Sequence, residues 1–405
     1  MSVRWVRFTN EQGESYPDWT PVKLGDVYTE RNEKGNDSLP ILSVSIHTGV
    51  SSGEMDEEEL GKRVSRSEDK SLYKKVLPGD LAFNMMRAWQ GAIGVVEIEG
   101  MISPAYIAAI PSEKIYPRFM NYYMRTASMI HTIDRQSYGL TDFRKRLYWD
   151  SFAAIRCMLP SYEEQVRIAE FLSDLDKKID NQAAYVADLE ERKQGLITRV
   201  FRQELRFTKP DGSSFPTWNT VKLGELGSFR RGGTLSKSDL SEDGIPCVLY
   251  GDLYTKYGEV IRTVTNNTAV QSGLTFAYKN DLLFPTSTTA DAVSLIAPSA
   301  IVTDGEIAIG GDVTIFTPDG IDSAFISYQI NGFRRRELSK FAKGTTIIHI
   351  GSADLEKCNI SVPCTEEQER IVSFFMTLDE QIENEKSLLD DWKEMKKGLL
   401  QQMFI

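Results

Sequence analysis

The chain has 405 residues, a net charge of −11, and a composition that is 41% hydrophobic and 10% aromatic. This composition is typical of folded domains with full cores and excludes a largely disordered chain. The N-terminal residues lack the apolar core of a signal peptide, and no stretch approaches about eighteen uninterrupted apolar residues. We therefore expect a cytoplasmic protein without a membrane span.

The cysteines and histidines are not spaced as metal ligands. Cys157, Cys247, Cys358 and Cys364 form no C-x-x-C pair, and the three histidines form no H-x-x-x-H pattern. We therefore expect buried, reduced thiols and no metal site.

The negative charge is unevenly distributed along the chain. Most of it falls in residues 161–205 and 363–405, whereas residues 1–160 and 206–362 are nearly neutral and contain basic clusters. The acidity of the whole chain therefore does not exclude binding of nucleic acid by the two larger segments.

Residues 1–160 are predicted to form a mixed α/β domain. Short strand-like runs, such as residues 39–44 and 91–96, are separated by turn residues, and one helix is expected over residues 118–131.

Residues 161–205 are predicted to form one long helix. Ser161, followed three residues later by Glu164, is typical of a capping box. Apolar residues then recur in alternating steps of four and three, which is the spacing of a coiled-coil seam. The seam residues are Ile168, Leu172, Leu175, Ile179, Val186, Leu189 and Leu196.

The chain then repeats itself. RFTKPDGSSFPTWNTVKLG at residues 206–224 resembles RFTNEQGESYPDWTPVKLG at residues 7–25, and residues 366–384 match residues 163–181 at ten of nineteen positions. A period of about two hundred residues indicates a duplicated domain with its helix rather than a solenoid. We predict a second mixed α/β domain over residues 206–362, with its own helix over residues 324–342.

The second long helix, over residues 363–405, carries the same signals. Thr365 and Gln368 are its expected capping box, and its seam residues are Ile371, Phe375, Leu378, Ile382, Leu389, Trp392 and Leu399. Both seams are broken at equivalent polar positions: Gln182 and Lys193 in one helix, Glu385 and Lys396 in the other.

A helix of about forty residues, about 60 Å long, needs a partner for its apolar seam, and the second copy is the most available one. Polar residues at seam positions commonly fix register. We predict an α+β protein of two tandem domains whose long helices pair as an antiparallel coiled coil with pseudo-two-fold symmetry.

Basic residues gather beside glycine-containing loops in both domains, where such side chains can neutralise phosphates or read base edges. For any single residue, an ordinary solvated charge has about even odds. The candidate DNA-binding residues are Arg63, Arg66, Lys74, Lys75, Arg87, Arg135, Arg144, Lys145 and Arg146 in the first domain, and Arg230, Arg231, Arg334, Arg335, Lys340, Lys343, Thr345 and Thr346 in the second.

Motifs that would indicate catalysis are missing from the sequence. There is no G-x-x-x-x-G-K-[ST], no G-x-G-x-x-G, no G-x-S-x-G, and no Asn- or Asp-Pro-Pro-aromatic tetrad of an amino-methyltransferase. We therefore predict a binding protein without catalytic residues of its own.

Together these motifs resemble the specificity subunit of a type I restriction-modification system. The resemblance is carried by the two P-x-x-E-[EQ] helix starts, which continue to R-I-x-x-[FL]-[FL]-x-x-[FL]-D-x-x-I, and by NMMRAWQGAIGVV at residues 84–96 with ISPAY at residues 102–106. It implies that residues 1–160 and 206–362 are target-recognition domains that each read half of a bipartite double-stranded DNA target. Residues 161–205 and 363–405 would then be spacers that set the gap and hold the modification subunits.

The resemblance also implies partners and cofactors. Two modification subunits would carry S-adenosylmethionine, two restriction subunits would use ATP and Mg²⁺, and this chain would hold no cofactor. Three alternatives stay open: a partner that fuses methyltransferase and nuclease, an enzyme with an unrecognised catalytic motif, and a noncatalytic coiled-coil scaffold.

Overall fold

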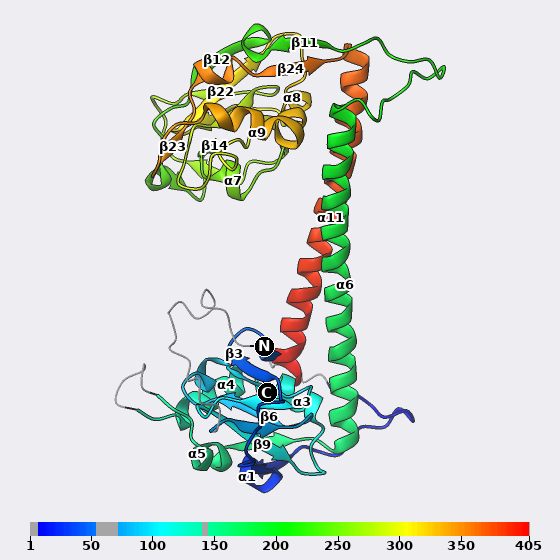
Figure 1. Ribbon diagram of the computed structural model, residues 1–405, viewed down its shortest axis with the longest axis vertical. Helices are drawn as coiled ribbons and strands as arrows, with labels where there is room; N and C mark the ends of the chain where they lie inside the picture. The colour runs from blue at the N-terminus through cyan, green and yellow to red at the C-terminus, as the bar shows by residue number, and fades with distance from the viewer. Residues whose placement is uncertain (1–6, 54–71, 140–144, 405) are drawn as a thin grey trace. The chain divides into compact units, whose positions relative to one another are not determined.

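The computed structural model describes residues 7–53, 72–139 and 145–404 (Figure 1). The chain divides into two compact units, Met1–Ala183 with Ser387–Ile405, and Ala184–Lys386. We call them the first and the second unit. Each contains one copy of the duplicated domain and parts of both long helices, α6 (Tyr162–Phe201) and α11 (Thr365–Met403). The functional boundaries expected at residues 160, 205 and 362 stay predictions.

In the first unit, two four-stranded sheets have the orders β2-β9-β6-β7 and β4-β3-β8-β5, and β1 pairs with β10. The strands are β1 (Thr20–Lys23), β2 (Tyr28–Glu30), β3 (Ile41–Ser45), β4 (Gly49–Ser52), β5 (Lys74–Val76), β6 (Leu81–Asn84), β7 (Ile93–Val95), β8 (Gly100–Ile102), β9 (Tyr106–Pro111) and β10 (Arg156–Leu159). The short helices are α1 (Leu24–Val27), η1 (Ala88–Gln90), α3 (Pro117–Tyr123), α4 (Ala127–Gln136) and α5 (Trp149–Ala154).

In the second unit, two five-stranded sheets have the orders β12-β22-β18-β20-β15 and β13-β16-β14-β21-β17, with the two-stranded pairs β11-β24 and β19-β23. The strands are β11 (Asn219–Lys222), β12 (Gly227–Arg231), β13 (Leu240–Ser241), β14 (Ile245–Val248), β15 (Val260–Ile261), β16 (Asn266–Thr268), β17 (Phe276–Ala277), β18 (Leu282–Pro285), β19 (Ser287–Thr288), β20 (Ser299–Ile301), β21 (Ile307–Ile309), β22 (Val313–Pro318), β23 (Ile348–His349) and β24 (Asn359–Val362). The short helices are η3 (Leu223–Glu225), η4 (Lys237–Asp239), α7 (Asp252–Thr255), α8 (Ser323–Gln329), η5 (Ile330–Arg334), α9 (Arg335–Leu338), η6 (Ser339–Phe341) and α10 (Ser352–Leu355).

Each unit is layered as sheet, sheet and helices. Side chains alternate across the central strands, as β geometry requires. In β6, Leu81 and Phe83 join the core that includes the helices, whereas Ala82 joins the core that both sheets line. In β18, Leu282 and Phe284 face the helices, and Leu283 joins the second core. The prediction of mixed α/β domains is confirmed.

The helices within the domains differ from the prediction. The single helix expected over residues 118–131 is wrong, because α3 ends at Tyr123 and α4 begins at Ala127. Thr126 caps α4 by accepting a hydrogen bond from the Met129 amide. The helix expected over residues 324–342 is present but contains a π-helical stretch at η5. A Cβ on Gly332 would lie 1.9 Å from Ile197 Cγ2, so only glycine fits at this close approach to α6.

The two long helices are antiparallel, as predicted. In the first unit, Ile168 and Leu172 near the start of α6 share a core with Leu399 and Met403 near the end of α11. In the second unit, the end of α6 shares a core with the start of α11 (Figure 1). The predicted seam residues are buried or half-buried throughout. The seam therefore packs against the domains as well as against the other helix.

An aromatic side chain at the far end of each helix completes each domain core. In the first unit, the Phe404 ring lies 5.3 Å from that of Tyr123 and 5.5 Å from that of Phe119, between ring centroids. In the second unit, Phe201 at the end of α6 lies 5.4 Å from Phe325. Neither domain core is therefore complete without the helix that follows the other domain.

The expected reciprocal capping boxes are wrong. The Glu164 amide donates to Ser161 Oγ, but the Glu164 carboxylate is fully buried and accepts hydrogen bonds from Arg7 and from Trp19 Nε1 instead. In the second helix, Thr365 already lies within α11. The Gln368 side chain donates to the Pro363 carbonyl, and its carbonyl oxygen accepts from the Asp322 amide.

The same buried carboxylate arrangement recurs in the second unit. Glu367, also fully buried, accepts two hydrogen bonds from Arg206, at 2.7 and 3.1 Å, and one from Trp218 Nε1 at 2.9 Å. Two charge-assisted bonds in the geometry of a guanidinium fork are stronger than neutral ones. Each long helix is thereby fixed to the hairpin that begins its domain.

Three of the cysteines are buried and Cys364 is half-buried, so the expectation of buried thiols holds for three of four. Burial raises the pKa of the Cys157 and Cys358 thiols to about 12 and that of Cys247 to about 11. Because the thiolate is the reactive form, we expect iodoacetamide at pH 8 to alkylate Cys364 first and the other three only after unfolding. Peptide mass spectrometry of the native chain tests this order; equally fast labelling of Cys157 would contradict it.

Candidate nucleic-acid interface

Several predicted DNA-binding residues form ion pairs within the protein. Lys74 pairs with Glu30, and Lys75 lies 3.4 Å from Glu33 and 3.1 Å from Glu99. Both lysine side chains are at least three-quarters buried, and their charges stabilise the edge of the second sheet. Arg63, Arg66 and Arg144 lie outside the described residues.

In the second unit, Arg230 and Arg334 are likewise used internally. Arg230 donates to Asp281 at 2.7 Å and to the carbonyl of Phe276. Arg334 donates to Glu337 at 2.7 Å and to Ser361 Oγ at 3.2 Å. Their burial and partners leave little of either guanidinium available to a phosphate.

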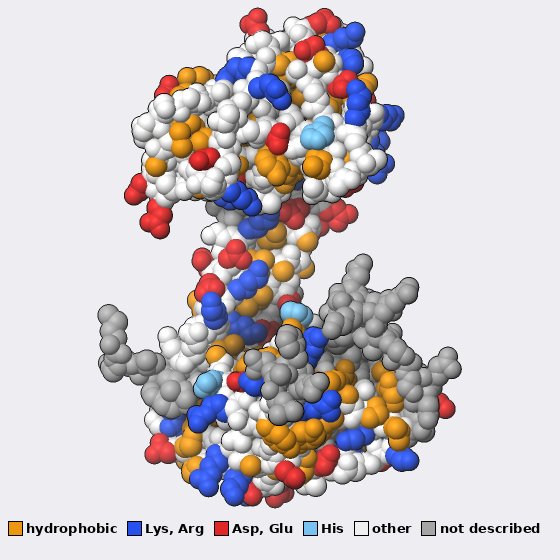
Figure 2. Space-filling view, turned by 90° about the vertical axis from the view of Figure 1, so that its left-hand side faces the viewer, with side chains coloured by type: hydrophobic (Ala, Val, Ile, Leu, Met, Phe, Trp, Pro, Cys, Tyr) orange, Lys and Arg blue, Asp and Glu red, His pale blue; other side chains and the backbone are white. Residues whose placement is uncertain are grey.

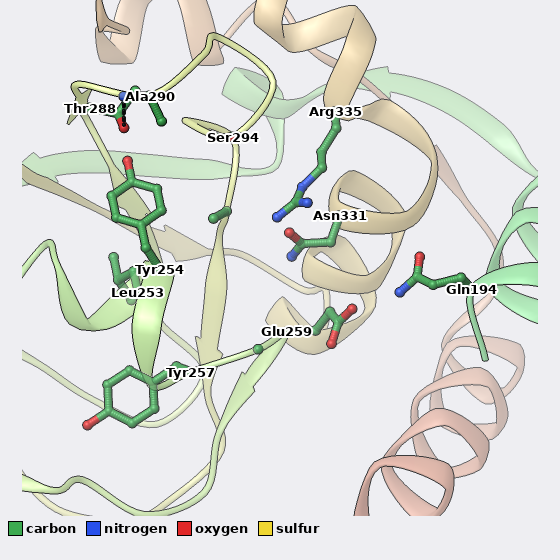
Figure 3. Close-up of a pocket in the computed structure, with 12 residues that line it drawn as sticks. Gln194, Leu253, Tyr254, Tyr257, Glu259, Thr288, Ala290, Ser294, Asn331 and Arg335 are labelled. Carbon is green, nitrogen blue, oxygen red and sulfur yellow. Dashed lines mark hydrogen bonds between the residues drawn. The ribbon is translucent and has the colours of Figure 1, made fainter. Parts of the chain in front are cut away.

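Arg335 lines a cavity of about 520 Å³ in the second unit (Figure 3). Figure 3 shows its guanidinium directed toward Asn331, with Tyr254 and Ser294 on the opposite side. Its Nε donates to the Ile296 carbonyl at 2.6 Å, and burial lowers its pKa. Arg335 therefore helps to hold the helical segment against the loop that contains Ile296.

In the first unit, four of the predicted residues come together at one corner. Lys145 lies over the ring of Trp89, which follows Arg87 by two residues in the sequence, and it pairs with Asp134, the sequence neighbour of Arg135. The backbone of Arg146 forms a bridge with Tyr138. We call Arg87, Arg135, Lys145 and Arg146 the basic corner.

Two aromatic side chains that the sequence did not single out adjoin the basic corner. Tyr138 is 60% exposed and Tyr148 is 38% exposed, and their rings lie 5.2 Å apart. Exposed tyrosines beside arginines are suited to contact with DNA, because a tyrosine hydroxyl can donate a hydrogen bond to a phosphate oxygen. In the sequence, Tyr148 follows Arg146 by two residues and Tyr138 follows Arg135 by three, so both lie next to predicted cations.

In the second unit, Arg231 and the loop of residues 343–349 lie at the same edge. Gly232, next to Arg231, donates its amide to Val313. The Thr286 amide donates to the Asp312 carbonyl, next to Val313, and the Thr286 carbonyl accepts from the Ile350 amide. These backbone hydrogen bonds connect the region of Arg231 to the end of the loop. Lys343, Thr345 and Thr346 are exposed on this loop, although Lys343 Nζ also lies 3.3 Å from Asp354.

Charge on the surface is mixed. On the face drawn in Figure 2, Lys and Arg side chains are interspersed with Asp and Glu. Among the described predicted residues, Arg87, Arg135, Arg146, Arg231 and Lys340 are exposed and have no ion pair or side-chain hydrogen bond within the described chain. These five are the cations whose charge is available to a ligand.

No group of three or more His, Cys, Asp or Glu side chains in the described ranges is arranged to hold a metal ion. Within the same ranges, no helix combines the length and the apolar character needed to span a membrane.

Two of the polar seam positions, Lys193 and Lys396, occupy equivalent ion-pair networks. In the first unit, Lys396 pairs with Asp176, which also accepts a hydrogen bond from Tyr122 at 2.7 Å. In the second unit, Lys193 pairs with Asp379 at 2.5 Å, and Asp379 accepts from Tyr328. Each network joins one long helix to the other and to a helix of the domain, which is consistent with a role in fixing register.

Comparison with known proteins agrees with this architecture. Residues 216–391 match the family model described as the type I restriction modification DNA specificity domain. The type I restriction enzyme MjaVIII specificity subunit of Methanocaldococcus jannaschii is 25% identical over 269 residues, which are 62% of this chain and 61% of that protein. The chain thus spans less than two thirds of the length of that relative.

Two solved structures share the fold along almost the whole chain. One, from work on complex assembly and conformational transition of the type I R-M system, is 20% identical with a TM-score of 0.57 and covers 95% of this chain and 97% of its own. The other, a type I restriction-modification system S subunit from M. genitalium, is 13% identical with a TM-score of 0.54 and covers 99% of this chain and 98% of its own.

These matches are to type I restriction-modification DNA specificity proteins. The predicted resemblance to a type I specificity subunit is thereby confirmed.

Proposed function

We propose that this chain is a noncatalytic subunit that selects the DNA sequence on which a type I modification complex acts. The observation that carries the proposal is the duplication of a whole unit: two domains of the same layered fold, each fixed by a buried carboxylate to the start of a long helix. A protein built in this way is suited to reading two separate half-sites.

In the first domain, the basic corner and the exposed ring of Tyr138 would contact one half-site. In the second domain, Arg231, Lys340 and the exposed Thr345 and Thr346 would contact the other. Arginines that contact phosphates position a protein on DNA, and hydroxyl and guanidinium groups read base edges in the major groove. The paired helices would set the gap between the half-sites.

The remaining parts of the proposal concern partners. Two modification subunits with S-adenosylmethionine and two restriction subunits with ATP and Mg²⁺ would supply the chemistry. A partner that fuses methyltransferase and nuclease would use the same arrangement, and the chain that copurifies identifies which system is present. A cytoplasmic location is part of this proposal, because the DNA target lies there.

Charge reversal separates DNA contacts from structural cations. Arg146→Glu and Arg231→Glu are each expected to weaken binding of the assembled complex about tenfold and to reduce the salt dependence, because each removes about one phosphate contact. Lys177→Glu, at an exposed position on α6, is the matched control and should leave affinity within about twofold.

Fluorescence anisotropy on specific and random duplexes, at several salt concentrations, measures both effects. Equal losses for Lys177→Glu and the two arginine variants would contradict the assignment of these arginines. Binding without salt dependence or preference for a duplex would contradict the proposed function itself.

A further inference from the structure

The second domain contains an open hollow close to Arg231. Its volume is about 710 Å³, and it lies among the segments that follow β12, β14 and β21, beside α7. We call it the β12-α7 hollow. The side chains in its lining that bear on its function are Leu235, Lys237, Leu240, Leu249, Tyr250 and Asp312.

The floor of the β12-α7 hollow belongs to the domain core, whereas its rim is apolar and exposed. Leu235 and Leu249 are buried in a core cluster with Cys247. Leu240 and Tyr250 also line the hollow, but they are 37% and 43% exposed. Large apolar side chains that stay in contact with water beside a concave surface are typical of a binding site.

The β12-α7 hollow is held in shape by contacts within the domain. The buried Asp252 carboxylate accepts hydrogen bonds from the Leu249 amide at 2.8 Å and from Asn266 at 2.9 Å, and it lies 3.3 Å from Lys256. A Cβ on Gly310 would lie 2.6 Å from Leu249 Cδ2, so glycine is needed for this close approach. Because Asp252 is neutralised by its own partners, a ligand meets the apolar rim rather than a buried charge.

Two charged side chains of opposite sign accompany the apolar rim. Lys237 and Asp312 line the hollow, are exposed, and form no ion pair within the described ranges. A lysine can contact a phosphate or a guanine edge. A carboxylate is repelled by phosphates, but it accepts a hydrogen bond from the amino group of adenine or cytosine. This pair of charges therefore suits the edges of bases better than the phosphate backbone alone.

The β12-α7 hollow adjoins the exposed edge that contains Arg231. The carbonyl of Leu235, four residues after Arg231, accepts a hydrogen bond from the Gly311 amide at 3.2 Å. The carbonyl of the next residue, Asp312, accepts one from the Thr286 amide at 2.9 Å. The hollow is therefore continuous with the surface on which the proposed DNA contacts of this domain lie.

We infer that the β12-α7 hollow reads one base pair of the half-site, and that Leu240 and Tyr250 contact the C5-methyl group of a thymine. This methyl group is the apolar feature by which the major groove distinguishes thymine, and apolar side chains contact it. The paired adenine would donate its amino hydrogen to Asp312. In the function proposed above, on which this inference rests, the half-site of the second domain therefore contains a thymine.

The experiment replaces each thymine of the bipartite target in turn by uracil, a change that removes only the methyl group. Fluorescence anisotropy measures binding by the full chain assembled with its modification subunits. One replacement is expected to weaken binding by wild type about fourfold, the effect of exposing one buried methyl group. The same replacement should alter binding by Leu240→Ser with Tyr250→Ser less than about 1.5-fold, because the methyl contact is already lost.

Tyr250→Phe is the matched control, because it keeps the ring and should keep the about fourfold effect of uracil. Tyr250→Ser alone removes only an exposed side chain, and it should reduce the effect of uracil without disturbing the core. Hydrogen exchange of each variant against wild type verifies that the second unit stays folded. A map of modified bases should show that the double variant accepts other bases at that one position and keeps the other half-site.

An equal effect of uracil on wild type and on the folded double variant would overturn the inference and leave the proposed function intact. So would a target in which no thymine is sensitive to the loss of its methyl group. A wild-type complex that selects no bipartite target would overturn the proposed function, and this inference with it.

Discussion

Replacing Lys193 with Met is expected to lower the free energy of unfolding of the second unit by about 3–5 kcal/mol, the usual effect of removing one partner from a buried ion pair. Lys193 Nζ lies 2.7 Å from Glu259 and 2.5 Å from Asp379, and all three side chains are about nine-tenths buried. The substitution removes the cation that lies between the two carboxylates and leaves Arg262, 3.8 Å from Asp379, beside only one of them. The Met side chain replaces the volume, so the loss measures charge rather than a cavity.

The matched control is Lys396→Met in the first unit. Lys396 faces one carboxylate, Asp176, and both side chains are about a quarter to a third exposed. Water can solvate the carboxylate that remains, so the expected loss is about 1 kcal/mol. Hydrogen exchange of peptides from each unit measures the two effects in the same sample. Equal losses at the two lysines would show that the deeper burial of Lys193 does not set the size of its effect.

The protonation state of Lys193 also determines how the stability of the second unit changes with pH. Burial lowers its pKa and is the largest single influence, but the charges of Glu259 and Asp379 together outweigh it, so the pKa is raised. The stabilisation is therefore complete below the unfolded-state pKa of about 10.4 and is lost as the pH rises through the higher folded-state value. The difference in stability between wild type and Lys193→Met should be unchanged from about pH 6 to about pH 9.

Inserting four helix-favouring residues after Ala183 in α6 and after Lys386 in α11 is expected to lengthen the gap between half-sites by about one or two base pairs. The two positions are equivalent in the repeat. Four residues add about 6 Å of helix at about 1.5 Å per residue, and DNA rises about 3.4 Å per base pair. Each half-site should stay the same, because the domains are not altered.

The control for this experiment is the same insertion in one helix only. It shifts one seam against the other and separates Lys193 from Asp379 or Lys396 from Asp176, so modification activity should fall at least about tenfold. Sequencing of modified bases gives the gap for the double insertion. Altered half-sites with an unchanged gap would contradict the assignment of the helices as a spacer.

The sequence predicted the long helices well because their seam is a local, periodic signal. It also placed Lys193 and Lys396 at equivalent polar positions, although it did not identify their partners. Glu164 was assigned to a capping box because the spacing from Ser161 fits one. Its buried carboxylate instead binds Arg7, 157 residues away, and no local pattern reveals such a contact.

The basic residues also show that a local sequence pattern does not reveal contacts between distant residues. Arg230 and Arg146 look alike in the sequence, since each lies in a run of cations beside a loop. Arg230 pairs with Asp281, 51 residues away, whereas Arg146 stays exposed. The repeat did contain a stronger signal than charge: Arg7 with Arg206, and Phe171 with Phe374, are identical in both copies, and each pair occupies equivalent positions in the structure.

The central claim is that this chain selects a split DNA sequence, and a genome-wide map of modified bases tests it most directly. Cells that express the chain with its modification subunit are compared with cells that lack the chain. We predict a bipartite motif with a fixed gap that is modified only when the chain is present. A map that is the same with and without the chain, under verified coexpression, would contradict the claim.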